Sequence, residues 1–210
     1  MTCIAQTGLF IQVMKKPKAR DRLLETAANL FTERGYVAVG INEIIDRSQT
    51  AKASFYHHFP SKENLCLTWL EETHARSNAR HDAILNAPGD PESKVLDYFS
   101  ALKEWMHTKD YRGCPFTNTV SSLDKASPPI SEQVELHKRS IRDFFINLAR
   151  DLAPAGSASC RLGTTLFLLY SGATTEAQNL QSNWPIDAAM ESVRHLVSVH
   201  QTSTIPLTSE

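Results

Sequence analysis

The stretch 50–65, TAKASFYHHFPSKENL, holds the densest group of distinctive side chains in a chain of 210 residues. Phe55 and Phe59 are four positions apart, so they share one face of a helix and can anchor it to a small core. Pro60 ends that helix, because proline cannot continue it. The stretch therefore predicts a short helix with one buried aromatic side.

The other side of this helix is polar. Lys52, Tyr56 and His57 lie on or near it, where an ammonium, a hydroxyl and an imidazole can reach phosphate groups. Lys62 stands beside the free backbone amides at the start of the next helix, which predicts an anion site. The side chains alone leave two readings open: a surface that binds nucleic acid, or an ordinary solvated helix.

Two further short helices precede this stretch. An apolar stripe with helical spacing predicts the first of them, which Gly35 ends as a left-handed residue. The stripe consists of Leu23, Ala27, Leu30 and Phe31. Three isoleucines within 41–45 mark the second helix, and residues 48–51 form a tight turn after it. Two short helices joined by such a turn form a helix-turn-helix, whose second helix enters the major groove of DNA.

The whole segment 20–65 resembles the DNA-binding domain of the TetR family of transcriptional repressors. The matching positions are Ala28, Leu30, Phe31, Gly35, Tyr36, Ile41, Ile44 and the run from Ser54 to Leu65. The resemblance implies that the chain binds double-stranded operator DNA as a homodimer and is not an enzyme. It also implies DNA contacts from Gln49, Thr50, Lys52, Ser54, Tyr56, His57 and Lys62.

Three residues in and after the turn depart from the family pattern. Gln49 replaces the usual glycine at a position that often needs a positive φ, which predicts local strain. Ala51 replaces the usual serine N-cap of the recognition helix and leaves Thr50 as the nearest hydroxyl. Ala53 replaces a glycine that is common close to the DNA backbone. These departures affect the expected contacts but leave the motif intact.

The remaining two thirds of the chain show helical patterns, and no strand alternation stands out. Ser61 is a good N-cap for a helix that continues to about Leu85. Further apolar stripes predict helices over 95–106, 130–152, 160–181 and 186–197. The segment YRGCPFTN, 111–118, interrupts the pattern, and its glycine and proline predict a fixed bend. The fold class is therefore all-α, with a three-helix helix-turn-helix DNA-binding domain and a larger helical domain. By the resemblance, the larger domain binds a ligand and dimerises.

Four segments follow from this pattern. Residues 1–17 are expected to be a disordered extension, unless Met14 is the true start, and 18–65 to be the DNA-binding domain. Residues 66–200 are expected to form the effector-binding and dimerisation domain, and 201–210 a disordered tail. The opening residues lack the basic-then-apolar order of a secretory signal.

Composition and charge limit the class of protein. The chain is 41% hydrophobic and 21% charged, which suffices for a core. Its net charge of −1 divides into +3 over the first 65 residues and −4 over the rest, which favours a nucleic-acid-binding N-terminal part. No apolar run approaches the roughly 18–20 residues of a membrane span. Four scattered cysteines predict a cytoplasmic protein with reduced thiols and without metal or cofactor.

The resemblance implies a small, largely apolar effector in the C-terminal domain. Candidates for its cavity are side chains on the inner stripes of three helices and on the bend between them, with a few polar groups to orient the ligand. They are Phe99, Trp105, Met106, Cys114, Phe116, Asn118, Phe145, Phe167, Tyr170, Thr174 and Gln178. Taken singly, each is equally explained by core packing, and Cys114 is either a redox-sensing thiol or an inert buried one.

The resemblance further implies that the last two long helices, within 157–182 and 186–200, form the dimer seam. Their small and apolar positions are Gly163, Leu166, Leu169, Gly172, Ala173, Ile186, Met190, Val193 and Val197. The alternative is that these positions belong to the core of one chain.

The rival reading is an enzyme or a ligand-carrying helical protein with an incidental helix-turn-helix. No Ser/His/Asp motif, glycine-rich phosphate loop or pair of carboxylates supports catalysis. His74 and His81 are seven positions apart on one helix, too far to chelate a metal ion together. Within the regulator class, the sequence does not distinguish a repressor from an activator.

Overall fold

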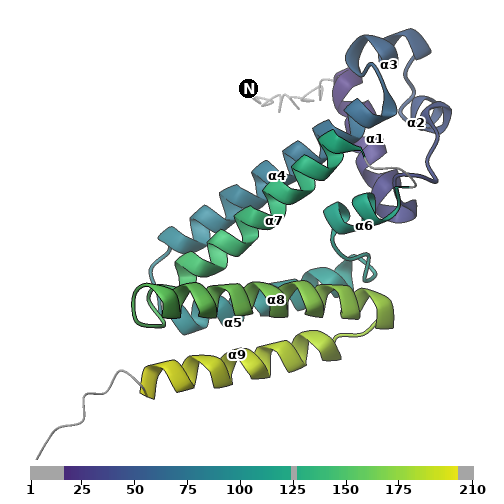
Figure 1. Cartoon of the computed structure of the whole chain (residues 1–210). Helices are drawn as coiled ribbons and strands as arrows, with labels where there is room; N and C mark the ends of the chain where they lie inside the picture. Colours follow the sequence, from purple (N-terminus) through teal and green to yellow (C-terminus); the bar gives the residue numbers. More distant parts are fainter. Residues whose placement is uncertain (1–16, 124–126, 203–210) are drawn as a thin grey trace, which may run out of the picture.

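The computed structural model describes residues 17–123 and 127–202, and all regular structure in these ranges is helical (Figure 1). The helices are α1 Ala19–Arg34, α2 Ile41–Arg47, α3 Lys52–His58, α4 Lys62–Asn86, α5 Pro91–Thr108, α6 Pro115–Ser121, α7 Pro128–Ala149, α8 Ser157–Leu180 and α9 Trp184–Thr202. The all-α fold class is confirmed. Helix α9 includes the first two residues of the expected tail, while 1–16, with Met14, and 203–210 lie outside the described residues.

Helices α1–α3 form a small unit at one end of the molecule, which we call the head (Figure 1). Gly35 ends α1 as predicted: its φ is +82°, and its N–H donates to the Phe31 carbonyl at 3.0 Å. Helix α3 ends at His58, where Phe59 continues in extended backbone ahead of Pro60. The predicted three-helix arrangement is therefore present, with the turn between α2 and α3.

Helix α4 connects the head to the rest of the chain. Its first turn is capped by Ser61, whose Oγ accepts the N–H of Asn64 at 3.0 Å, and Glu63 adds a favourable charge there. Helices α4 and α7 pack along each other, and their ends away from the head lie near α5 and α8 (Figure 1). We call α5–α9 the body.

The buried side chains form two clusters. The head core joins residues of α1–α3 to Leu65, Cys66, Trp69 and Leu70 of α4, to Phe116 of α6 and to Ile130 of α7. The body core joins residues of α5, α7, α8 and α9. The head core therefore continues past residue 65, and parts of the body complete it.

The predicted bend at 111–118 is a turn followed by the start of α6. Asp110 and Tyr111 have φ values of +52° and +51°, and Gly113 has a φ of +69°. A Cβ on Gly113 would also lie 2.5 Å from Cδ of Gln178 on α8. This position requires glycine both for its backbone conformation and for the close approach of α8.

Candidate nucleic-acid interface and ligand cavity

Helix α3 has the two faces that its sequence predicts. Phe55 and Phe59 are 0% and 2% exposed and pack in the head core with Ile44 and Ile45 of α2. The exposed side chains are Lys52, Tyr56 and His57, and Ser54 is half-buried. Aromatic burial on one side thus turns the polar side of α3 outward, as a helix that enters a DNA groove requires.

The turn before α3 is held by a side chain from α1. Gln49 has a φ of +51°, as its place in the motif predicts. Arg22 donates from Nε to the Ser48 carbonyl at 3.0 Å and from Nη2 to the Gln49 carbonyl at 3.3 Å. The Thr50 hydroxyl bonds to Ser48 Oγ at 2.8 Å, and α3 starts after Ala51 without a side-chain cap. Arg22, which sequence reasoning missed, therefore positions the turn.

Lys62 is engaged within the head. Its Nζ lies 4.3 Å from the centroid of the Tyr36 ring and donates to the Val37 carbonyl at 3.4 Å. Partial burial lowers the pKa of Lys62. An anion at the start of α4 would have to compete with these contacts, which join α4 to the loop after α1.

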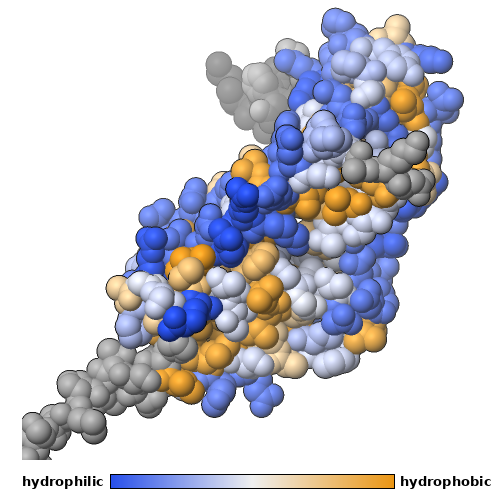
Figure 2. Space-filling view, in the orientation of Figure 1, coloured by the Kyte–Doolittle hydropathy of each residue, from blue (hydrophilic) through white to orange (hydrophobic). Residues whose placement is uncertain are grey.

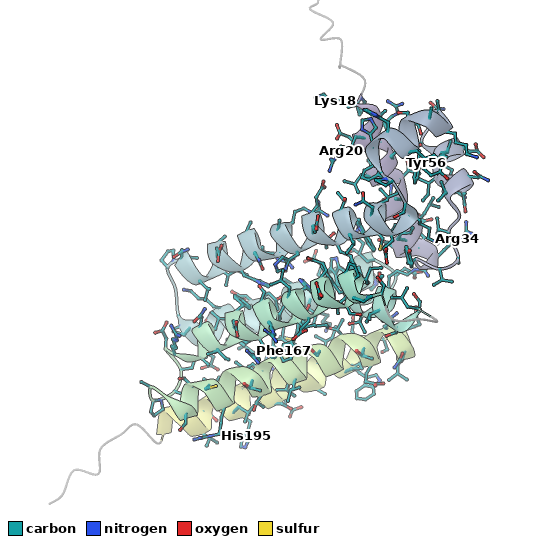
Figure 3. The ribbon with its side chains drawn as sticks, turned by 45° about the horizontal axis from the view of Figure 1, so that its top comes forward. Lys18, Arg20, Arg34, Tyr56, Phe167 and His195 are labelled. Atoms are coloured by element: carbon teal, nitrogen blue, oxygen red, sulfur yellow. The ribbon has the colours of Figure 1, made fainter. Side chains whose placement is uncertain are left out.

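Most arginines of the head are paired, but two lysines are not. The pairs are Arg34 and Arg47 with Glu43, and Arg20 with Glu72. Within the described residues, Lys18 and Lys52 make no ion pair. In Figure 3, Lys18 lies at the start of α1, at the same end of the molecule as Tyr56. Lys18 was not among the predicted DNA contacts, although its cluster of basic neighbours was a signal.

A cavity of about 700 Å³ lies where α4, α5 and α7 meet the start of α6 and the middle of α8. Its volume falls in the range of small-molecule sites. Its apolar wall includes Tyr98, Leu102, Trp105, Phe116 and Tyr170. Its polar wall includes Thr73, Arg76, Ser77 and Arg80 of α4, Lys94 and Asp97 of α5, and His137 of α7. The lining of the cavity therefore combines apolar and charged side chains, and α5 contributes both kinds.

Four of the eleven candidate ligand residues line this cavity: Trp105, Cys114, Phe116 and Tyr170. Phe99, Met106 and Phe145 are fully buried in the body core, and Phe167 packs against that core (Figure 3). These four side chains fill space between helices instead of bordering the cavity, because neighbouring helices cover them.

The three polar candidates have partners within the protein. Gln178 donates from Nε2 to Asn118 Oδ1 at 3.1 Å, and Asn118 donates from Nδ2 to the Arg112 carbonyl at 2.6 Å. Thr174 donates its hydroxyl to the Tyr170 carbonyl at 2.7 Å. Gln178 and Asn118 therefore hold the turn before α6 against α8. None of the three side chains lines this cavity, but Asn118 borders a second cavity beside α1.

Two neutral histidines lie at and beside the cavity. His81 Nε2 is 3.0 Å from the Tyr98 hydroxyl. His137 stacks on Phe116 with ring centroids 3.6 Å apart and faces His74, with 3.3 Å between the two Nδ1 atoms. Burial is the main reason why the pKa of His81 falls to about 4 and that of His137 to about 3. Near pH 7 these imidazoles therefore act as uncharged hydrogen-bonding and stacking groups.

Sequence reasoning missed the polar part of the cavity lining because it placed no ligand candidate on the helix from Ser61 to about Leu85. The signal was present: Thr73, Arg76, Arg80 and Ile84 recur every three or four positions, so they share one face of α4. Only the packing of α4 beside α5 and α7 shows that this face borders a cavity.

Cys114 is half-buried, and Lys138 Nζ lies 3.8 Å from its Sγ. Within the ranges that the structure covers, no three His, Cys, Asp or Glu side chains gather in a way that could hold a metal ion. No described helix combines the length and the apolarity that crossing a membrane requires.

The predicted dimer seam is wrong at several of its positions. Leu166, Ala173, Ile186, Val193 and Val197 belong to the body core of the same chain, and Leu169 and Met190 pack against it. Gly163 is buried where a Cβ would lie 2.6 Å from the backbone nitrogen of Ile146. The exposed residues of α8 and α9 include Leu168, Gly172, Leu180 and Trp184 instead. Figure 2 shows apolar patches on the surface over this part of the molecule.

Comparison with known proteins agrees with this geometry. Residues 23–67 match the family of bacterial regulatory proteins, tetR family. The chain is 23% identical over 189 residues to the transcriptional repressor NemR of Escherichia coli, across 85% of this chain and 94% of that protein. It is 26% identical over 156 residues to the repressor KstR2 of Mycolicibacterium smegmatis, across 74% of this chain and 75% of that protein. The chain is thus similar to TetR-family transcriptional regulators, and residues 23–67 carry the helix-turn-helix domain of that family.

The fold of head and body together matches solved structures. A TetR transcriptional regulator from Legionella pneumophila superimposes with a TM-score of 0.77 at 18% identity, over 87% of this chain and 98% of that one. The fold is therefore TetR-like along the whole described chain. Because the family consists of DNA-binding regulators, the rival reading as an enzyme is set aside.

Proposed function

We propose that this protein is a transcriptional repressor that binds a roughly palindromic operator as a homodimer and leaves it when a small molecule enters the cavity. One observation carries the proposal. Phe116 is 1% exposed, belongs to the head core and also borders the cavity. A ligand in the cavity therefore touches a side chain that supports the DNA-binding unit.

In the proposed complex, α3 lies in the major groove. Lys52, Tyr56 and His57 reach the DNA from its exposed face, and Lys18 contacts the phosphate backbone beside it. Gln49, Thr50, Ser54 and Lys62 are further contacts that the family resemblance suggests. NemR and KstR2 both carry the name of repressor, which supports repression over activation. A bacterial operator as partner also implies a cytoplasmic protein.

The homodimer forms, in this proposal, through the outward faces of α8 and α9. Burial of the exposed Leu168, Leu180 and Trp184 against a second chain stabilises the dimer, because apolar surface leaves water. Gly172 lets the backbone of the second chain approach closely. Two heads are then held about 34–36 Å apart, the spacing of half-sites one helical turn apart on B-DNA.

Release from DNA follows from the position of the cavity. A second cavity lies between α1 and the turn before α6, and it shares Thr73, Arg76, Trp105 and Pro115 with the first. A ligand that fits the first cavity better in one arrangement of α4, α6 and the head favours that arrangement. DNA affinity falls by the same factor by which operator DNA weakens ligand binding, because the coupling is reciprocal.

The test is a binding titration with DNA from upstream of the protein's own coding region. We expect a specific complex whose affinity falls steeply with salt, two protein chains per site, and repression of a reporter driven by that DNA. No specific complex at low salt with the unliganded protein would contradict the proposal. Activation of the reporter would retain DNA binding but overturn repression.

A further inference from the structure

Positive charge predominates in the polar wall of the cavity. Arg76 and Arg80 from α4 and Lys94 from α5 line it, against one acidic residue, Asp97. The histidine in the lining, His137, is neutral near pH 7. The wall therefore carries a formal excess of two positive charges facing a space that a small molecule can enter.

These three cations differ in how many hydrogen bonds and ion pairs they already make within the protein. Arg76 lies 3.7 Å from Glu72 and donates to Thr73 Oγ1 at 3.0 Å. Lys94 donates to the Leu85 carbonyl at 3.4 Å. Arg80 makes no hydrogen bond or ion pair with any residue that the structure describes. Arg80, an exposed residue that lines the cavity, is thus the cation whose donors no described protein group occupies.

The apolar part of the lining has a different character. Tyr98 and Leu102 are each 7% exposed and Phe116 is 1% exposed, and together with Tyr170 they offer an aromatic and aliphatic surface. Apolar groups placed against this wall leave water, which is favourable roughly in proportion to the area buried. Lys94 precedes Tyr98 and Leu102 by one and two turns of α5, and Arg80 lines the same cavity from α4, so one ligand can touch both the cations and the apolar side chains.

We propose that the effector is an organic carboxylate with an apolar carbon skeleton, which packs on the aromatic side chains of the cavity while its carboxylate binds Arg80. This inference rests on the proposed function, since it names the chemical class of the effector. The guanidinium of Arg80 binds the carboxylate through two parallel N–H donors, and Lys94 adds a second positive charge. A cationic ligand is disfavoured by the charge of this wall, and a neutral apolar ligand leaves the arginine unused.

Matched pairs of acid and amide separate the effect of the ligand's negative charge from the effect of its apolar shape. Three pairs suffice: 2-naphthoate with 2-naphthamide, 4-phenylbutyrate with 4-phenylbutyramide, and decanoate with decanamide. Calorimetric titration into the full-length protein gives the affinity of each. We expect the acid of the best-fitting pair to bind about tenfold more tightly than its amide, because a charge-assisted bond replaces a neutral one. The preference should shrink as salt is raised.

Two arginine variants test whether Arg80 is the residue that binds the carboxylate of the ligand. Arg80→Gln should remove most of the preference for the acid while leaving the affinity of the amide within about twofold. Arg142→Gln, an exposed arginine on α7 outside the cavity, should keep the preference. Circular dichroism and thermal unfolding of each variant show that it is folded. A folded Arg80→Gln protein with an unchanged acid preference overturns the assignment.

Equal affinity for acid and amide in every pair, or binding of neither member of any pair, also overturns the inference. The proposed function is measured separately, as operator binding without any probe. Intact operator binding without an acid preference means that this inference alone fails. Absence of operator binding with a clear acid preference means that the proposed function fails while the cavity still takes an anion.

Discussion

The head core is made of short helices, and the body core is made of long ones. Helices α2 and α3 have seven residues each, a length at which an isolated helix is not stable in water. Helices α7 and α8 have 22 and 24 residues and bury continuous stripes against each other. The head therefore depends on side chains from α4, α6 and α7, whereas the body core contains no residue from α1–α3.

Because the head depends on the body in this way, a ligand in the cavity can affect the packing of the head. The cavity borders Phe116, which serves the head core, and Tyr98, which serves the body core. A change in the body can thus reach the head without any direct contact between ligand and α3. If the head core were complete without residues of the body, a ligand in the cavity could not change the head through the packing of Phe116.

The largest expected effect comes from Phe116→Ala. Truncating a phenylalanine that is 1% exposed should lower the free energy of unfolding by about 3–5 kcal/mol. Because Phe116 supports the head, amide hydrogen exchange in α2 and α3 should accelerate strongly. Phe99→Ala, which removes an equally buried ring from the body core, is the control and should affect α2 and α3 less. Equal acceleration in both variants would show that the head does not depend on α6.

Gly163→Ala should cost roughly 3 kcal/mol of stability, because its Cβ would lie 2.6 Å from the Ile146 backbone and force α7 and α8 apart. Urea unfolding measures the loss. Gly172→Ala on the same helix has no atom within 4 Å of the added Cβ, so the folded chain should gain up to about 1 kcal/mol from helix propensity. Sedimentation of Gly172→Ala tests the seam: an unweakened dimer would argue against close packing of the two chains there.

Acid should weaken the packing of α4 and α7 around the cavity. The pKa values of His81 and His137 are about 4 and about 3 in the folded protein, below the usual value near 6.5. As pH falls below 6.5, the unfolded chain binds protons that the folded chain cannot, so stability is full above 6.5 and decreases toward pH 4.

A loss of roughly 1 kcal/mol per histidine is expected between pH 6.5 and 5. Thermal unfolding over this range should show a smaller loss in His81→Gln than in the parent protein. His195→Gln, which changes an exposed histidine on α9, is the control and should behave like the parent (Figure 3). If the stability of His81→Gln depended on pH as that of the parent protein does, His81 would not contribute to the loss of stability in acid.

Lys52 of the head and Lys62 at the start of α4 should differ in how they affect operator binding. Lys52→Ala should weaken the complex severalfold and lower the salt slope by about one, with stability unchanged, because Lys52 is exposed and makes no ion pair in the described chain. Lys62→Ala should also lower the melting temperature, because it loses the Tyr36 and Val37 contacts. Fluorescence anisotropy at several salt concentrations, with thermal melts, separates the two outcomes. Identical behaviour of the two variants would refute the distinction.

The smallest expected effect is at two left-handed glutamines, one in each region. Gln49 in the head has a φ of +51°, and Gln181 at the end of α8 has a φ of +49°. Glycine adopts this conformation without the steric cost that other residues carry, so Gln49→Gly and Gln181→Gly should each gain about 0.5 kcal/mol. Chemical denaturation measures the gain. Destabilisation in either case would mean that the glutamine side chain contributes more than the backbone strain removes.

The sequence predicted the head more fully than the cavity, and the reason is the range of the interactions. Gly35, Gln49 and Ser61 act through backbone groups within a few residues, so local motifs were enough to predict a helix end, a positive φ and a cap. The spacing of Phe55 and Phe59 on one helix face was enough to predict a buried ring. Arg22 escaped this reasoning because its carbonyl partners, at Ser48 and Gln49, are more than 25 positions away.

In the body, the residue type alone does not show whether a side chain lines the cavity or fills the core. Phe99 and Phe116 have the same side chain and are both buried, yet one fills the body core and the other borders the cavity. Likewise, Asn118 and Gln178 are polar groups 60 positions apart whose mutual hydrogen bond no local pattern reveals. Which residues enclose empty space depends on how whole helices are stacked.

By itself, the sequence determined that the regular structure of the described chain is helical, where the second helix of the helix-turn-helix lies and which face of it is polar. These properties follow from hydrophobic periodicity and local turn chemistry, which act within about two helical turns. Tertiary structure alone decided that α4 contributes Arg76 and Arg80 to a cavity, that Val193 is internal and Leu168 external, and that Phe116 supports the head. A helix with apolar residues on several sides can bury more than one of them, and only its neighbours in space decide which.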